Sequence, residues 1–170
     1  MGISAIHSLN TTACEILLQE IPGEVCLSYL ISGCPLGCKG CHSRDSWSAS
    51  RGIPLSEDRL KADCTKYQGL LSCVLFMGGE WQPECLRDLL HVCKLMGLKT
   101  ALYTGLSYCP VMLHQSLDYV KTGAWQAELG GLNNPNSNQR LYDLQQQICL
   151  NPLLWPTPGK TYPALPAFSL

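Results

Sequence analysis

The sequence predicts an α/β domain with a mainly parallel sheet, and three observations lead to it. Short apolar runs typical of buried strands recur along the chain, segments with helical spacing separate them, and Gly, Ser or Thr follows the runs. Strands that alternate with helices form parallel β/α units. With 170 residues the chain suffices for one compact domain. A closed barrel of eight β/α units needs about 250 residues and is excluded.

The first half of the chain contains two predicted strands and one helix. Residues 25–31 form an apolar run that stops at a Ser-Gly pair, as a buried strand does before a loop. Residues 32–54 are rich in Gly, Ser and Cys and lack periodicity, which is typical of a long functional loop. Residues 55–67 are predicted to be helical, with Ser56 as the N-cap before two acidic residues. Residues 71–77 form the second buried strand.

The second half repeats the alternation. A helix is predicted over 83–96, because a Pro opens it, its Leu residues recur at helical spacing and Gly97 can cap its end. Residues 98–103 predict a third strand, 110–117 a short helix and 119–121 a fourth strand. The pattern weakens beyond Gly123. We assign residues 1–150 to the folded domain and 151–170, which contain five prolines, to an extended tail on its surface.

The composition argues against two classes of binding partner, nucleic acids and membranes. Lys plus Arg is 12 and Asp plus Glu is 13, so the net charge of −1 favours neither nucleic acid nor an anionic membrane. No apolar run is long enough to span a bilayer. The chain contains 11 cysteines, and its first ten residues show no secretion signal. We therefore expect reduced thiols and a cytoplasmic protein.

Three cysteines stand within eight residues of the predicted loop, as Cys34-x3-Cys38-x2-Cys41. Thiolates are soft ligands that suit iron-sulfur clusters or zinc, and a cubane held by three cysteines leaves one iron open to a substrate. The loop also contains Gly33, Gly37 and Gly40, which let the backbone curl tightly enough for three sulfurs to converge.

Other chemistries are weighed against the cluster. Cys38-Lys-Gly-Cys41-His42 also fits covalent haem attachment, but that reaction calls for export. Zinc needs a fourth ligand, and His42 directly beside Cys41 is awkwardly placed for it. A redox dithiol leaves Cys34 without a role. The iron-sulfur interpretation uses all three thiols.

The triplet resembles the signature of radical S-adenosylmethionine (SAM) enzymes. The segment from Cys38 to Trp47 is similar to that of proteins that activate anaerobic ribonucleoside-triphosphate reductase, in which a Gly precedes the third Cys. Gly78-Gly79-Glu80 and Tyr103-Thr104-Gly105, each at a predicted strand end, match further motifs of that family in the same order. Trp81 departs from the pattern, since many radical SAM enzymes have Pro there. The resemblance covers about residues 20–142.

The resemblance implies both a fold and cofactors. The fold would be the small, open, partial (β/α) barrel of a radical SAM domain. Cys34, Cys38 and Cys41 would bind a catalytic 4Fe–4S cluster, which reductively cleaves SAM into methionine and a 5′-deoxyadenosyl radical. Five further residues are expected to bind SAM. Glu80 would accept a hydrogen bond from its amino group, Gly78 and Gly79 would admit its methionine moiety, and Gly40 and His42 would line the adenine pocket.

The expected activity is abstraction of a hydrogen atom from one glycine of the large subunit of anaerobic ribonucleoside-triphosphate reductase, which leaves a glycyl radical. A reducing electron donor such as flavodoxin would supply the electron. Two alternatives stay open. The first is a radical SAM enzyme that acts on another glycyl-radical enzyme, a peptide or a small molecule. The second is a non-catalytic iron-sulfur electron carrier.

Overall fold

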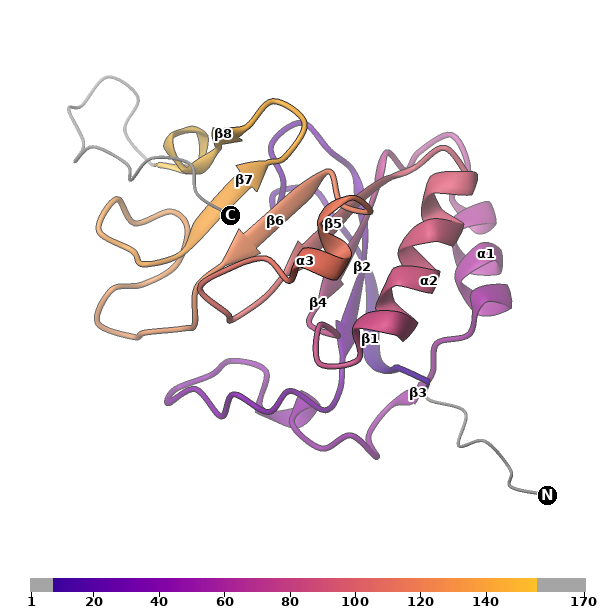
Figure 1. Ribbon diagram of the computed structural model, residues 1–170, viewed down its shortest axis with the longest axis horizontal. Coiled ribbons are helices and arrows are strands. Elements are labelled where there is room, and N and C mark those ends of the chain that lie inside the picture. Colours follow the sequence, from indigo (N-terminus) through magenta and orange to yellow (C-terminus); the bar gives the residue numbers. More distant parts are fainter. Residues whose placement is uncertain (1–7, 156–170) are drawn as a thin grey trace.

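The computed structural model describes residues 8–155 and confirms the α/β fold. One eight-stranded sheet has the strand order β3-β1-β2-β4-β5-β6-β7-β8 (Figure 1). Neighbours from β2 to β6 are parallel, and the strands on both sides of them are antiparallel. Because β3 and β8 stand at opposite ends of this order, the sheet is open, as in a partial barrel.

The parallel strands coincide with the predicted ones. They are β2 (Cys26–Ile31), β4 (Cys73–Met77), β5 (Lys99–Tyr103) and β6 (Tyr119–Thr122). Their apolar runs are almost wholly buried, as expected for strands covered on both faces. The register aligns Leu30 with Met77, Met77 with Tyr103 and Tyr103 with Lys121. The carboxyl ends of all four strands therefore meet at one edge of the sheet.

Four outer strands were missed by the sequence analysis. They are β1 (Asn10–Leu17), β3 (Ile53–Pro54), β7 (Arg140–Asp143) and β8 (Ile148–Cys149). β1 is only partly buried and pairs antiparallel with β2 from Thr11 opposite Ile31 to Leu17 opposite Cys26, with a register shift between Thr11 and Ala13. β3 and β8 have only two residues each, too few to show a periodicity.

The three helices are α1 (Glu57–Lys66), α2 (Pro83–Leu95) and α3 (Val111–His114). The predicted cap of α1 is confirmed, because the backbone N–H of Arg59 donates to the Ser56 hydroxyl at 3.2 Å. α3 is shorter than the predicted 110–117. The Ser116 carbonyl accepts a hydrogen bond from the Thr100 hydroxyl at 2.6 Å, which turns the chain toward β6. No helix within residues 8–155 has the length and apolar character to cross a bilayer.

The helices cover one face of the sheet (Figure 1). Leu60 of α1, Leu90 of α2 and Leu113 of α3 pack there against Phe76 and Leu102 of the central strands. A smaller cluster covers the other face, which carries no α-helix within residues 8–155 and which Leu154 of a short 3-10 helix contacts. Its buried members come from strands and loops: Ile21, Cys26, Cys73, Leu75, Ala101, Tyr119, Leu141 and Leu150. The helix-free face therefore has room for a cavity.

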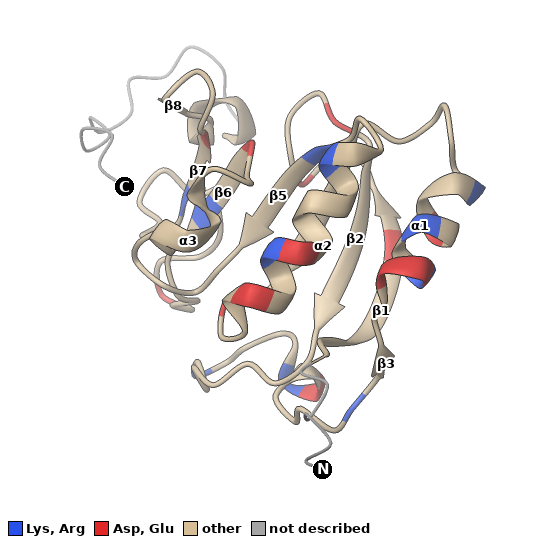
Figure 2. Cartoon of the chain, turned by 45° about the vertical axis from the view of Figure 1, so that its right-hand side comes forward, with Lys and Arg blue, Asp and Glu red and all other residues tan. Residues whose placement is uncertain are grey.

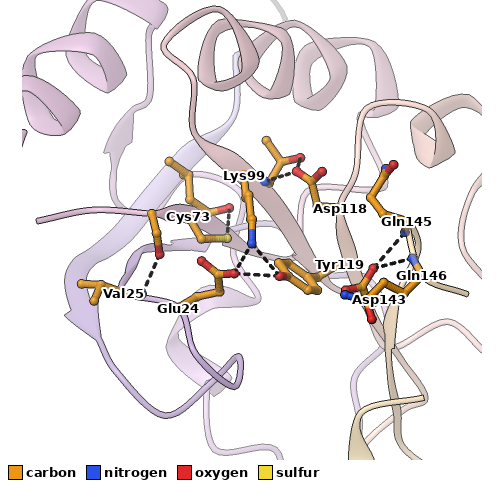
Figure 3. A network of polar contacts seen from close by, with 12 residues as sticks. Glu24, Val25, Cys73, Lys99, Asp118, Tyr119, Asp143, Gln145 and Gln146 are labelled. Atoms are coloured by element: carbon orange, nitrogen blue, oxygen red, sulfur yellow. Dashed lines mark hydrogen bonds and ion pairs between the residues drawn. The ribbon is translucent and has the colours of Figure 1, made fainter. Parts of the chain in front are cut away.

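A polar network fastens the amino ends of the parallel strands (Figure 3). Glu24, which precedes β2, accepts hydrogen bonds from Lys99 Nζ at 2.5 Å and from the Tyr119 hydroxyl at 2.7 Å. Burial raises the pKa of Glu24, but the hydrogen bonds from Lys99, Ser72 and Tyr119 outweigh it, and the pKa is lowered. Figure 2 shows charges of both signs along α1 and α2, consistent with the balanced composition.

The end of the described chain differs from the expected extended tail. Residues Asn151–Leu154 form a short 3-10 helix, η2, and Asn151 is fully buried. The Asn151 side chain accepts from the backbone N–H of Leu141 at 2.8 Å and donates to the Gln139 carbonyl at 2.9 Å, which anchors η2 to β7. The predicted tail beyond residue 155 lies outside the described residues.

Candidate functional site

The cysteine triplet lies on the loop that leaves the carboxyl end of β2, at the lower edge of the sheet in Figure 1. Hydrogen bonds tie this loop to its base: Gly33 N–H donates to the Ser46 carbonyl at 2.7 Å, and the Ser32 hydroxyl donates to the Arg51 carbonyl at 2.9 Å. Gly33 has φ +96°, and a Cβ there would lie 3.2 Å from both the Ala49 Cβ and the Trp81 indole nitrogen. Glycine therefore allows the tight start of the loop.

Cys34, Cys38 and Cys41 are free, partly exposed thiols. Burial raises the pKa of Cys34, a backbone hydrogen bond from Leu36 opposes this, and nearby Glu80, Cys38 and Cys41 raise it further. The three sulfurs thus lie within electrostatic range of one another. Within residues 8–155, however, no three His, Cys, Asp or Glu side chains are already arranged to hold one metal ion. To bind a cluster, the thiols must lose their protons and turn toward a common centre.

Glu80 lies at the adjacent strand end, directly after β4 and the Gly78-Gly79 pair. It is 8% exposed. Its Oε1 accepts a hydrogen bond from the Thr104 hydroxyl at 2.5 Å, whereas its Oε2 is buried and has no partner in the described part of the chain. Burial raises the pKa of Glu80, against the Thr104 hydrogen bond and the charge of Lys121. A buried oxygen with unused acceptor capacity suits a cationic donor.

The motif that contains Glu80 has a close backbone approach. Gly78 has φ +90°, and a Cβ there would lie 2.5 Å from the Trp81 ring. Trp81, the residue that departs from the family pattern, therefore packs against the glycine. The hydroxyl of Thr104 accepts a hydrogen bond from the Leu106 backbone N–H at 3.0 Å, which leaves its proton for Glu80.

The sequence analysis gave no role to Lys121, near the end of β6. Its Nζ donates to the carbonyl oxygens of Gly123 at 3.0 Å and Thr104 at 3.5 Å. Burial lowers the pKa of Lys121 to about 8, while the charges of Cys38 and Glu80 act in the opposite direction. A lysine near the carboxyl end of a buried parallel strand is unusual, and this is the feature of the sequence that could have identified Lys121.

Trp125 is a second residue that was missed. Its ring centroid lies 4.6 Å from that of His42, and its indole nitrogen is buried without a hydrogen-bond partner among residues 8–155. A Cβ on Gly40 would lie 3.5 Å from that nitrogen. The structure thus brings the predicted pair Gly40 and His42 against one aromatic side chain from the loop after β6.

A cavity of about 850 Å³ opens where these elements meet, lined by Cys41, His42, Tyr103, Lys121, Trp125 and Gln139, among others. Tyr103 also packs against the smaller core cluster, so the cavity lies on the helix-free face of the sheet. Gly78, Gly79 and Glu80 lie outside its lining, but Thr104 contacts both Glu80 and Lys121. Cys41 and His42 are therefore gathered with Lys121, and Glu80 is connected to them through Thr104.

The chain has eight further cysteines, and none of them forms a disulfide within residues 8–155. Cys26, Cys64, Cys73, Cys93 and Cys109 are buried, and Cys14, Cys85 and Cys149 are partly exposed. Burial raises the pKa of Cys93 and Cys64, in Cys64 to about 11. These thiols are poor nucleophiles and poor ligands.

Comparison with known proteins places the same segment in a family. Residues 21–128, more than half of the chain, match the family described as "4Fe-4S single cluster domain". The chain is 32% identical over 111 residues to the pyruvate formate-lyase-activating enzyme of Clostridium pasteurianum. This match covers 62% of this chain and 44% of that protein. It is also 32% identical over 109 residues to the pyruvate formate-lyase 1-activating enzyme of Escherichia coli K12, and this match covers 61% of this chain and 42% of that protein. The matches span less than half the length of these relatives.

Proposed function

Because the chain belongs to the 4Fe-4S single cluster domain family, we propose that it is a radical SAM activating enzyme with a 4Fe–4S cluster on Cys34, Cys38 and Cys41. When bound, the cluster supplies the electron that cleaves SAM into methionine and a 5′-deoxyadenosyl radical. The observation that carries the proposal is the unpaired, buried Oε2 of Glu80 at the same edge as the three thiols.

The chain's own residues bind and orient SAM. Glu80 accepts a hydrogen bond from the amino group, with Thr104 holding the other carboxylate oxygen in place. Gly78 and Gly79 let the backbone approach the methionine moiety. Gly40 and His42 border the adenine, and contact with Trp125 holds the His42 ring at the cavity wall.

The proposed substrate is a glycine of anaerobic ribonucleoside-triphosphate reductase, on its large subunit. The segment from Cys38 to Trp47, with Gly40 before the third cysteine, supports this choice. A second candidate is pyruvate formate-lyase, which the relatives with 32% identity activate according to their names. Both are glycyl-radical enzymes, and both would need a reducing donor such as flavodoxin. We place the reaction in the cytoplasm, where thiols stay reduced.

The test is anaerobic reconstitution with iron and sulfide, followed by reduction with SAM and each candidate enzyme separately. We expect a glycine-centred doublet in the electron paramagnetic resonance spectrum with the reductase and none with pyruvate formate-lyase. Cys38→Ala is expected to abolish it, while Cys14→Ser, which changes a thiol of β1, keeps it. A doublet with pyruvate formate-lyase alone would reassign the substrate. A cluster that never cleaves SAM would make the protein an electron carrier and refute the proposal.

A further inference from the structure

Lys121 holds a partly buried positive charge on the cavity side of the sheet. Its Nζ is fixed by two backbone carbonyls, those of Gly123 and Thr104. It lies over the Tyr103 ring, 5.8 Å from the centroid. The ion pairs formed within residues 8–155 do not include Lys121. No carboxylate therefore neutralises this ammonium at close range.

The negative groups that face Lys121 belong to the proposed site. Lys121 lines the same cavity as Cys41, and the charges of Cys38 and Glu80 act on it. Such interactions are strong when the charge is buried, because little water and salt screen them. The neighbouring lysine of the cysteine loop, Lys39, is solvent-exposed instead. Two lysines near the thiols thus differ mainly in burial.

We infer that Lys121 tunes the reduction potential of the proposed cluster by placing a partly buried ammonium in the cavity that the ligand Cys41 also lines. Reduction adds one negative charge to a cluster that three thiolates already make electron-rich, and a fixed cation stabilises the reduced form more than the oxidised one. Net charge and hydrogen bonding around an iron-sulfur cluster are known determinants of its potential. The inference rests on the proposed function only for the presence of the cluster on Cys34, Cys38 and Cys41.

The test compares midpoint potentials of reconstituted protein without SAM or a protein substrate, by anaerobic titration with dithionite and redox mediators, followed by electron paramagnetic resonance. Lys121→Met is expected to weaken binding of the electron at least tenfold, which is a shift of about 59 mV to lower potential for a one-electron couple. Lys121→Arg keeps the charge and is expected to stay near the wild type. Lys39→Met removes an exposed charge from the cysteine loop and is expected to shift the potential much less.

The Met variant is expected to fold, because a partly buried ammonium with a lowered pKa is costly to the native state. Circular dichroism checks this, and Lys121→Gln serves as a second neutral variant that keeps a hydrogen-bond donor at the end of the side chain. Equal potentials in wild type, Lys121→Met and Lys121→Gln would overturn the inference, as would equal shifts in Lys121→Met and Lys39→Met. Failure of the wild type to assemble a cluster would instead refute the proposed function.

Discussion

The substitution Glu80→Gln tests whether the Glu80 carboxylate binds SAM or only stabilises the fold. Gln has nearly the same shape, and its amide oxygen can still accept the hydrogen bond that the Thr104 hydroxyl donates to Oε1 at 2.5 Å. The substitution removes the negative charge and puts an NH₂ group where the unpaired Oε2 now lies. That group is a donor only and cannot accept a hydrogen bond from the ammonium of SAM.

Hydrogen bonds to charged groups contribute about 1.5 to 3 kcal/mol. Losing one is expected to weaken SAM binding roughly 10- to 150-fold, at about 1.4 kcal/mol per tenfold change. The effect on folding has the opposite sign. Burial raises the pKa of Glu80, so its contribution to stability is most favourable below pH about 4.5, the ordinary value, and is lost as pH rises through the folded pKa. At pH 7 Glu80→Gln is therefore expected to be at least as stable as the wild type.

Anaerobic isothermal titration of the reconstituted protein with SAM measures the first effect, and thermal unfolding between pH 4 and pH 8 measures the second. Glu57→Gln is the matched control, because Glu57 is an exposed residue of α1 whose partner Lys61 lies 3.3 Å away in a surface pair. It is expected to change neither quantity appreciably. Unchanged SAM affinity in Glu80→Gln, or a clear loss of stability at pH 7, would refute the reasoning.

Three further predictions concern the fold. Gly78→Ala is expected to cost about 2 kcal/mol in urea unfolding, because φ is +90° and the new Cβ would meet the Trp81 ring at 2.5 Å. Glu24→Gln is expected to cost about 1 kcal/mol at pH 7, a modest value because the half-exposed Lys99 is screened by water. The pKa of Glu24 is lowered in the fold, so this difference in stability is present above pH 4.5 and disappears as the pH falls. Thermal unfolding at a series of pH values measures it. Leu90→Ala is expected to cost about 3 kcal/mol in urea unfolding, because Leu90 of α2 is fully buried in the main core cluster.

Each of these has an outcome that contradicts it. Wild-type stability of Gly78→Ala would mean that Trp81 moves aside freely. A Glu24→Gln deficit that persists at pH 3 would show that the network acts through packing and not through charge. A loss below about 1 kcal/mol in Leu90→Ala would mean that the helix face of the core collapses to fill the space. Asp88→Ala, an exposed change on the same helix, is the control for Leu90.

The sequence alone predicted the parallel centre of the fold, because the determinants of β2, β4, β5 and α2 are local. Each buried strand is a continuous apolar run, and α2 has its apolar residues on one face between Pro83 and Gly97. The partly exposed β1 carries no such run and exists through pairing with β2. Its place in the sheet is decided by contacts that no short window of sequence contains.

The candidate site divides in the same way. The sequence identifies Cys34, Cys38 and Cys41 by their spacing. It identifies Gly78-Gly79-Glu80 by its position directly after an apolar run. Whether those residues bind a cluster and SAM is a prediction for the experiments above. Lys121 and Trp125 form no motif, and the one signal in the sequence is the lysine near the end of an apolar strand.

Only the tertiary structure placed Lys121 and Trp125 beside the cysteine loop. The register of β5 and β6 puts Lys121 next to Tyr103, and the chain after Gly123 returns Trp125 to His42, more than 80 residues away in sequence. Burial then makes these positions matter, because a charge or an indole N–H shielded from water interacts strongly with whatever group lies nearest. The spacing of residues along the chain identifies candidate ligands. The tertiary structure determines which charged and aromatic side chains surround them.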